Sequence, residues 1–361
     1  MAGSGLASGS ALAVRQYDDK AFREYADKLL LQQYMGTSME SVIQVKENLK
    51  KFPGDTDYFA LRMNLDSEGI EDDNDLEGNE EEMVFHSYNV TGKIYKNAVK
   101  STGQLSERRS AFDLKDEAMD ALTTWGAQKV ENLMFQDLAR IDGVLYASAT
   151  EAQRDAWAVA QGDHRVVYGN DVANHTGDNS VDVAKVDATN DTCTTTGISL
   201  VKRLAQLADP QVRPLKIEGG EEYYVMFIHP LCARDLKNSS AWQQAQREAM
   251  PRSSDNPIFT GMLGMWDGVI VKESKKVPLL SAVGASSINV AQNFLCGAQA
   301  LVIEHMSLPM RPGSKIVLQE ELFDYSSRWG VAAMMGMAHG KTQFNSIDHG
   351  VATYFAAAVA D

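Results

Sequence analysis

The sequence predicts an α+β fold, because helix-type and strand-type patterns occupy separate stretches of the 361-residue chain. From residue 113 to residue 141, apolar residues recur at spacings of mostly three to five, which is the repeat of one helix face. From residue 54 to residue 103 the repeat changes to two, which is typical of strands. Strand-like runs separated by turns return between residue 293 and the end of the chain. This length is typical of two or three domains.

The composition excludes several classes of protein. Hydrophobic residues make up 44% of the chain, which is enough to form a core and argues against bulk disorder. No apolar run approaches the roughly 20 residues that span a membrane, and the N-terminus is a poor signal peptide. The three cysteines show no CxxC motif and no disulfide framework. The net charge of −15 argues against a protein that grips nucleic acid phosphates, but suits a surface that faces DNA without sticking to it.

The chain begins with a segment of low complexity. The first 14 residues are rich in Gly, Ser and Ala, which is typical of a flexible arm. Residues 15–34 are then predicted to form a helix with Phe22, Tyr25 and Leu29 on one side. Residues 38–49 are expected to link this helix to the next unit.

Residues 54–103 are predicted to form a long β-hairpin. Phe59, Leu61 and Met63 alternate with polar residues on the outgoing strand, and Val84 and Tyr88 do so on the returning strand. The connection between the strands is acidic and contains glycine, which is typical of a solvated tip. Since a two-stranded hairpin is marginally stable alone in water, we expect this one to lie on another surface.

The stretch from residue 113 to residue 141 is predicted to be one long helix that acts as a brace. Asp113 is a suitable N-cap, Arg140 is expected in the last turn, and Gly143 follows as a stop signal. A helix of this length spans roughly 40 Å at about 1.5 Å per residue. Its core-facing residues are predicted to include Leu122, Trp125, Leu133 and Leu138.

The second half of the chain mixes helices and strands. Residues 147–191 are polar and are predicted to form loops with short strands. Thr195 is expected to cap a helix that ends at Asp209-Pro210, and residues 223–228 read as a buried strand. His229-Pro230 is expected to open another helix, with the proline at its first position.

Two short patterns resemble ligand-binding motifs, and both fail on spacing. Asp73, Asp75, Glu77 and Gly78 fit the opening of a calcium loop, but Val84 stands where a bidentate Glu is required. Gly336, Gly340, Lys341 and Thr342 resemble a phosphate loop, but only three residues separate the glycines and four are needed. A solvated hairpin tip is therefore the favoured interpretation of the first pattern, and no nucleotide site is predicted at the second. No metal and no cofactor are predicted.

His229 and Cys232 are the only close pair of a histidine and a cysteine in the chain. Such a pair can serve as a nucleophile with its base, or as metal ligands. A helix start packed on a strand is the simpler interpretation, so no catalytic residue is predicted here.

Several segments, in order and spacing, resemble the major capsid proteins of tailed bacteriophages, which have the Hong Kong 97-like fold. Within that family, the resemblance is to the branch typified by the capsid protein of phage N4. It covers nearly the whole chain from about Gly54. The residues that carry it are Gly54-Asp55, LEGNEE at 76–81, Asp113-Leu114, Trp125, IFTGMLGMWDGVIV at 258–271, FLCGAQAL at 294–301, RWGVAAMMGMAHG at 328–340 and HGVATYF at 349–355.

The resemblance implies a division of the chain into the parts of that fold. These parts are an N-terminal arm and helix (1–53), an extended E-loop (54–103), a P-domain (104–146) with its spine helix (113–141), an A-domain (147–300) and C-terminal strands (301–361) that return to both domains. Some members crosslink subunits through a lysine and an asparagine. Lys93, Lys96 and Lys100 lie on the E-loop, but no motif supports such a crosslink.

The function implied by the resemblance is structural rather than enzymatic. Hexamers and pentamers of the chain would form the icosahedral head shell around double-stranded DNA, without sequence-specific binding and without a membrane. Assembly in the host cytoplasm would involve a portal protein, a scaffolding protein and possible decoration proteins. The E-loop would lie across a neighbouring subunit, so the expected inter-subunit contacts are Phe59, Leu61, Met63, Val84 and Tyr88.

Two alternatives stay open at this point. A bacterial encapsulin-type compartment shares the fold and encloses cargo enzymes instead of a genome. A soluble enzyme that uses His229 and Cys232 would show a pocket there and would form a small oligomer rather than a shell.

Overall fold

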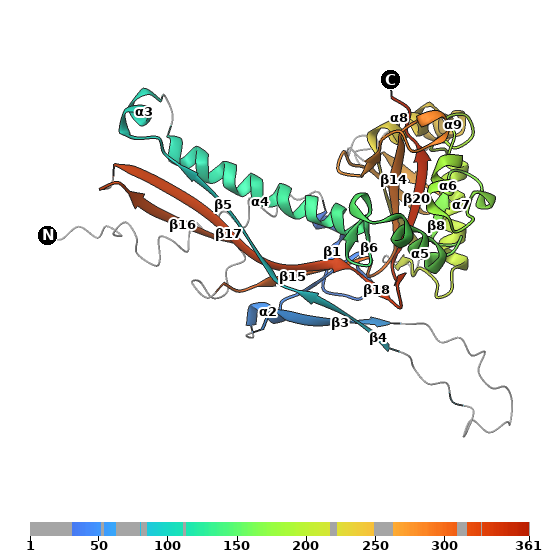
Figure 1. Cartoon of the computed structure of the whole chain (residues 1–361), viewed down its shortest axis with the longest axis horizontal. Helices are drawn as coiled ribbons and strands as arrows, with labels where there is room; N and C mark the ends of the chain where they lie inside the picture. The colour runs from blue at the N-terminus through green and yellow to red at the C-terminus, as the bar shows by residue number, and fades with distance from the viewer. Residues whose placement is uncertain are drawn as a thin grey trace.

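A computed structural model describes residues 31–51, 54–62, 80, 85–110, 113–216, 222–248, 263–308, 316–325 and 327–360. Figure 1 shows a long arm of strands lying along one helix, a compact lobe at one end of that arm, and a β-hairpin that projects beneath both. Mixed helix and sheet confirm the predicted α+β class. Among the described helices, none has the length and apolar character needed to cross a membrane.

The brace helix is α4, which runs from Leu114 to Leu138. Its predicted N-cap is confirmed, because the Asp113 carboxylate accepts the backbone N–H of Lys115 at 2.9 Å. The predicted end is wrong by three residues. Asp142 and Gly143 adopt positive φ angles of 44° and 81°, so the chain turns back there. The strands β6 (Arg140–Ile141) and β7 (Val144–Leu145) therefore form a tight hairpin after the helix.

Replacing Asp113 by alanine is expected to lower the free energy of unfolding by about 1 kcal/mol, the usual loss when an N-cap carboxylate is removed. Two N–H groups of the first turn, those of Lys115 and Asp116, would lose their acceptor. Urea unfolding of the purified chain measures the change. Asp113→Asn restores a side-chain acceptor, and a loss equal to that of the alanine variant would contradict the capping role.

The arm is built on a mixed sheet whose central strand is β17. One face of this sheet carries α4, which packs Leu122 against Leu318, Val331 and Ala333. Residues 38–49, predicted as a linker, instead contain a strand that pairs in parallel with β15. The strands of this sheet are β1 (Met35–Gly36), β2 (Ile43–Lys46), β15 (Leu301–Met306), β17 (Arg328–Lys341), β16 (Ile316–Phe323) and β5 (Lys93–Lys100).

The compact lobe contains a second mixed sheet covered by helices. The predicted strand at 223–228 is confirmed as the buried strand β10, and Pro230 opens α8 as expected. The strands are β11 (Gly264–Trp266), β12 (Val269–Glu273), β10 (Glu222–Ile228), β14 (Val290–Cys296), β20 (Val351–Ala357) and β8 (Val166–Tyr168), with β9 (Leu215–Lys216) and β13 (Leu279–Leu280) at its margins. The helices are α5 (Glu151–Gln161), α6 (Asn179–Lys185), α7 (Thr195–Leu207), α8 (Pro230–Asn238) and α9 (Ser240–Glu248).

Two helices lie where the sequence predicted loops with short strands. The first, α5, opens with a reciprocal capping box between Thr150 and Gln153, and the second, α6, is capped by Asp178. Both signals are readable in the sequence, but the polar composition of residues 147–191 hides them. The cap of α7 is Thr194 rather than Thr195, because the Thr194 hydroxyl accepts the backbone N–H of Gly197.

The predicted hairpin is confirmed in its described part. The strands β3 (Thr56–Arg62) and β4 (Phe85–Thr91) pair antiparallel from Thr56 opposite Thr91 to Arg62 opposite Phe85. The chain then continues into β5 and α3 (Gln104–Arg109), so residues 93–100 belong to the arm sheet. The predicted arm of 1–14 and most of the predicted helix of 15–34 lie outside the described residues, which begin with Leu31 and a short turn at Gln32–Tyr34.

The C-terminal half of α4 joins the two sheets. Phe135 packs edge-on against Phe227 of β10, with ring centroids 5.4 Å apart. The same cluster contains Met335 of β17 and Phe294 of β14, so one helix end contacts both sheets. Of the four predicted core residues, Leu122, Leu133 and Leu138 are buried, and Trp125 is half-buried against the same clusters.

Candidate assembly surfaces

The hairpin residues predicted to touch another subunit divide into three groups. Phe59 and Leu61 are fully buried within their own chain, and Phe59 packs with Val302 of β15 and Ala338 of β17. Tyr88 is half-buried against the same cluster. Met63 and Val84 lie outside the described residues. In this conformation Phe59 and Leu61 have no surface left for a second subunit, so they anchor the hairpin root.

The opposite face of the hairpin is the exposed one. The Tyr58 side chain is 62% exposed, and Ala60, Ser87 and Asn89 are exposed beside it. Because strand side chains alternate, burial of Phe59 and Leu61 turns these residues outward. The sequence analysis missed Tyr58, since the period of two shows that one face is buried without showing which partner buries it.

A pair of carboxyl groups fixes the hairpin root to the arm sheet. Glu304 of β15 is fully buried, and its Oε1 atom accepts the backbone N–H of Leu49 at 2.7 Å. The carboxyl group of Asp57 on β3 lies near enough for its negative charge to act on Glu304. The buried Glu304 Oε2 atom has no hydrogen-bond partner among the described residues, an environment that favours the neutral acid over the carboxylate.

The pKa values favour a proton on Glu304 and a charge on Asp57. Burial, reinforced by the nearby Asp57 charge, raises the pKa of Glu304 to about 7. Burial acts in the same direction on Asp57, but hydrogen bonds from the Tyr58 backbone and from Asn48 outweigh it and lower the pKa of Asp57. Lys46, whose Nζ atom lies 3.7 Å from Asp57, favours the ionised form of Asp57 as well.

A buried ion pair lies where the arm sheet meets the lobe. The Nζ atom of Lys341, at the end of β17, lies 2.7 Å from Asp348 Oδ2, and both side chains are 2% exposed. The Asp348 carboxylate also accepts hydrogen bonds from Trp157 of α5 at 3.3 Å and from Gln343 at 2.6 Å. Arg165 donates to the backbone carbonyl of Asp348. This pair therefore holds two elements of the lobe to the last residue of the arm sheet.

The same ion pair argues against phosphate binding by the glycine-rich pattern at residues 336–342. Gly336, Gly340 and Lys341 lie inside or at the end of β17 rather than in a loop before a helix. The Lys341 ammonium is paired with Asp348. A Cβ atom at Gly340 would lie 2.5 Å from the Tyr88 hydroxyl. The glycine is needed for close packing of the hairpin. The calcium-loop pattern at residues 73–84 lies outside the described residues apart from Glu80.

A second polar chain connects α4 to the arm sheet. Asp137 of α4 contacts His339 Nδ1 of β17 and accepts from Arg140 Nε at 2.8 Å. The other ring nitrogen of His339 lies 2.8 Å from the Tyr95 hydroxyl on β5. The helix, the central strand and the outer strand are thereby joined through consecutive side chains.

His229 and Cys232 do not form a reactive site. The Nδ1 atom of His229 accepts the backbone N–H of Leu231 at 3.3 Å, which makes it the N-cap of α8. Burial lowers the pKa of His229, so the ring is neutral at pH 7. Cys232 is fully buried, and Asn293 Nδ2 approaches its sulfur at 3.5 Å. A buried thiol beside a capping imidazole supports the helix-start interpretation.

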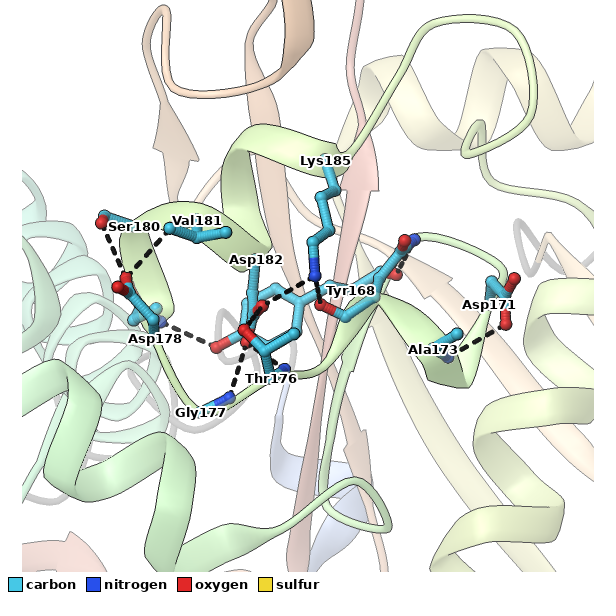
Figure 2. A network of polar contacts seen from close by, with 12 residues as sticks. Tyr168, Asp171, Ala173, Thr176, Gly177, Asp178, Ser180, Val181, Asp182 and Lys185 are labelled. Carbon is cyan, nitrogen blue, oxygen red and sulfur yellow. Dashed lines mark hydrogen bonds and ion pairs between the residues drawn. The ribbon is translucent and has the colours of Figure 1, made fainter.

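A polar network fixes one surface of the lobe (Figure 2). The buried carboxylate of Asp182 accepts the backbone N–H of Thr176 at 2.8 Å and that of Gly177 at 3.1 Å, and pairs with Lys185 at 3.3 Å. Asp178 caps α6. The hydrogen bonds that its carboxylate accepts from the Ser180 hydroxyl and the Val181 backbone lower its pKa. Oxygen atoms of Glu151, Asp155 and Asp178 lie within 4.8 Å of one another, but Asp155 and Asp178 accept backbone N–H groups, so capping accounts for their placement.

Exposed apolar side chains occur at both ends of the molecule. Leu105 belongs to α3 and Leu322 to β16, elements that reach the far end of the arm in Figure 1, and Tyr325 follows β16. Leu207 of α7 and Met265 of β11 belong to the lobe. Scattered single residues of this kind are ordinary on a surface. Together with the exposed hairpin face that carries Tyr58, these residues show that the chain has several separate surfaces available for contact.

Comparisons with known proteins agree on one family. The family model described as "Phage capsid protein" matches residues 5–358. The chain is 26% identical over 362 residues to the "Major capsid protein" of Pseudomonas phage KPP25, covering 93% of each chain.

Solved structures show the same similarity. The cyanophage Pam1 capsid asymmetric unit superimposes with a TM-score of 0.80, at 26% identity and 100% coverage of both chains. The capsid of Ralstonia phage GP4 gives a TM-score of 0.73 at 26% identity, covering 91% of this chain and 90% of that one. The capsid of Helicobacter pylori bacteriophage KHP30 shares the fold at a TM-score of 0.60 and 14% identity.

Proposed function

This chain belongs to the phage capsid protein family, and from that premise we propose how it builds a shell. It is a major capsid protein of a tailed phage and a component of the virion head. Copies of the chain associate into hexamers and pentamers, which tile an icosahedral shell around the double-stranded genome. Lateral contacts between subunits supply the stability, and the chain catalyses no reaction.

The shape of the subunit is the observation that supports this proposal most. An arm, a lobe and a projecting hairpin give one chain contact surfaces that face several directions. A modest area at each contact suffices, because a subunit held at several places gains avidity from all of them.

The described elements support the following assignment of parts. The arm sheet with α4 is the P-domain, and its spine is Leu114–Leu138. The lobe is the A-domain, to which the chain returns in β20. The hairpin of β3 and β4 is the E-loop, and its exposed face with Tyr58 lies across a neighbour.

The partners are assigned by the same reasoning. A portal protein and a scaffolding protein act during assembly in the host cytoplasm, and a decoration protein is a possible later addition. The genome is enclosed without sequence-specific contact, which the net charge of −15 favours. The motifs at 76–81 and 258–271 support a place in the branch typified by the phage N4 capsid protein.

Electron microscopy of the native particle, with nuclease protection on the same sample, tests the proposal. We expect faceted shells tens of nanometres across that protect double-stranded DNA. Small shells filled with protein and lacking protected DNA would instead indicate an encapsulin-type compartment. A discrete small oligomer under every assembly condition would contradict the shell itself.

Replacing residues 66–82 with a short Gly-Ser linker is expected to abolish shell formation while leaving the subunit folded. The linker removes the distal hairpin but keeps Phe59, Leu61 and the strand β5, which are part of the subunit's own packing. Light scattering measures assembly, and the thermal unfolding midpoint serves as the control. Intact shells from this variant would contradict a role for the distal hairpin in lateral contacts.

A further inference from the structure

Most of the net negative charge of this chain lies in one short segment. Residues 63–84 contain ten Asp or Glu residues and no Lys or Arg, against a net charge of −15 for the whole chain. This segment is attached to β3 at Arg62 and to β4 at Phe85, which form the last registered pair of the hairpin. Two thirds of the net negative charge is therefore tethered to one end of the molecule.

The next stretch of chain has the opposite sign. Residues 93–109 contain Lys93, Lys96, Lys100, Arg108 and Arg109 against the single acid Glu107, a net charge of +4. Among the described residues, the ammonium groups of these three lysines have no acidic partner within ion-pair distance. The Lys100 Nζ atom lies over the Phe323 ring, 4.3 Å from its centroid. The three side chains are exposed.

The lysines lie on the outer strand of the arm sheet. Lys96 and Lys100 alternate with Tyr95, which packs toward α4 and His339, so they point to the face that the helix does not cover. Ile94 is 48% exposed on this same face, and Ala332 and Met334 of β17 are half-buried beside it. Glu321 of β16 lies on this face in register with Gly330, so β17 separates it from Lys100.

The acidic segment cannot neutralise the far part of its own basic strand. Figure 1 shows that β4 and β5 run on in one direction, from the hairpin toward α3. At about 3.3 Å per residue, Phe85 is roughly 26 Å of chain from Lys93 and roughly 50 Å from Lys100. Half of a 22-residue segment reaches at most about 36 Å from its attachment. Lys100 and the arginines of α3 therefore lie beyond the reach of the segment in the same subunit.

We propose that the uncovered face of β5, with Lys96 and Lys100, is the docking surface for the acidic segment 63–84 of a second copy of this chain. This inference rests on the proposed function, since it identifies the surface on which the hairpin of a neighbour lies. Charge complementarity selects the occupant, because the segment is the one concentrated source of negative charge in the sequence.

The arrangement is head-to-tail. The negative end of one subunit meets the positive strand of the next, and that subunit presents its own negative end onward. Such heterologous contacts close into rings or continue as open arrays. The unlike charges thus set the polarity of the subunits around a capsomer, and long-range attraction speeds their encounter at low salt.

Charge reversal followed by mixing tests the proposal. One variant carries Lys96→Glu and Lys100→Glu, and the other carries Asp72→Lys and Asp73→Lys. At 0.15 M salt each alone is expected to lose at least tenfold in assembled fraction by light scattering. A 1:1 mixture is expected to recover at least half of the parent's assembly, because each variant then offers the charge that the other lacks. Full assembly of either variant alone, or no recovery on mixing, would overturn the proposal.

A matched neutral variant shows whether the assembled fraction depends on the charge at these positions. Replacing the same two lysines with glutamine removes the attraction without adding repulsion, so the assembled fraction of this variant is expected to lie between those of the parent and the glutamate variant. Equal behaviour of the glutamine and glutamate variants would contradict an electrostatic contact. Circular dichroism of each variant checks that the subunit is folded.

A crosslinking measurement tests the contact without reversing any charge. A chain with Lys100→Cys and Asp73→Cys, assembled and then oxidised, is expected to give a ladder of covalent multimers on a non-reducing gel. The three native cysteines are buried and serve as the background in the parent chain. Exclusively monomeric product would overturn the proposal. Failure of the parent to form shells would instead contradict the proposed function, so the two failures are distinguishable.

Discussion

Replacing Asp348 by alanine is expected to lower the free energy of unfolding by about 3–5 kcal/mol, the usual effect of removing one partner of a buried ion pair. The Lys341 side chain, which is 2% exposed, would keep its charge after losing the carboxylate that lies 2.7 Å from its Nζ atom. Trp157 and Gln343 would lose their acceptor at the same time. Urea unfolding at pH 7, followed by tryptophan fluorescence, measures the change.

Two controls separate the charge from the packing. Asp163→Ala removes an exposed carboxylate of the same lobe and is expected to change the free energy by less than about 0.5 kcal/mol. The double variant Lys341→Met with Asp348→Leu removes both charges and is expected to recover most of the loss. A double variant as unstable as Asp348→Ala would show that the surrounding hydrogen bonds, rather than the unpaired charge, account for the effect.

Replacing Glu304 by glutamine is expected to remove a pH dependence of stability between about pH 4.5 and pH 7. In the folded chain the pKa of Glu304 is raised to about 7, against an ordinary value of 4.5. The folded state thus holds a proton that the unfolded chain releases, so stability falls as the pH rises through this interval. The full difference corresponds to about 3 kcal/mol, at 1.36 kcal/mol for each pKa unit.

The glutamine variant keeps the hydrogen bond to Leu49 without the titration. Its amide oxygen can accept the backbone N–H of Leu49, as the Glu304 Oε1 atom does. Urea midpoints at pH 5, 6, 7 and 8 are expected to show a steeper fall for the parent than for the variant. Glu320→Gln, an exposed partner of Lys115, should keep the parent's slope. Parallel slopes for the parent and the Glu304 variant would contradict the assigned proton.

Since Asp57 belongs to β3, the same titration acts on the hairpin. Above pH 7 two negative carboxylates would face each other between β3 and β15, and the root of the hairpin would be loosened. Faster amide hydrogen exchange in β3 at pH 8 than at pH 6, after correction for intrinsic rates, is the expected local sign.

Local elements of the fold could be predicted where a single period runs for many residues. The brace helix and its Asp113 cap, the paired strands on either side of the acidic segment, and the buried strand at 223–228 are all observed. The helices α5 and α6 were missed, because polar composition was weighed above the capping signals at Thr150 and Asp178. The end of α4 was misplaced because the apolar stripe continues past Leu138 to Ile141, which lies in a hairpin.

The sequence by itself determined the strongly periodic elements, the overall charge, the absence of a recognised catalytic motif and the resemblance to phage capsid proteins. Only the tertiary structure decided which surface each element covers. Phe59 and Leu61 are buried on their own sheet, Lys341 meets Asp348, and Glu304 meets Asp57. Period and capping depend on residues a few positions apart, whereas Glu304 and Asp57 are brought together across most of the chain by the packing of the β3–β4 hairpin on the arm sheet. That packing depends on whole elements, which local patterns do not specify.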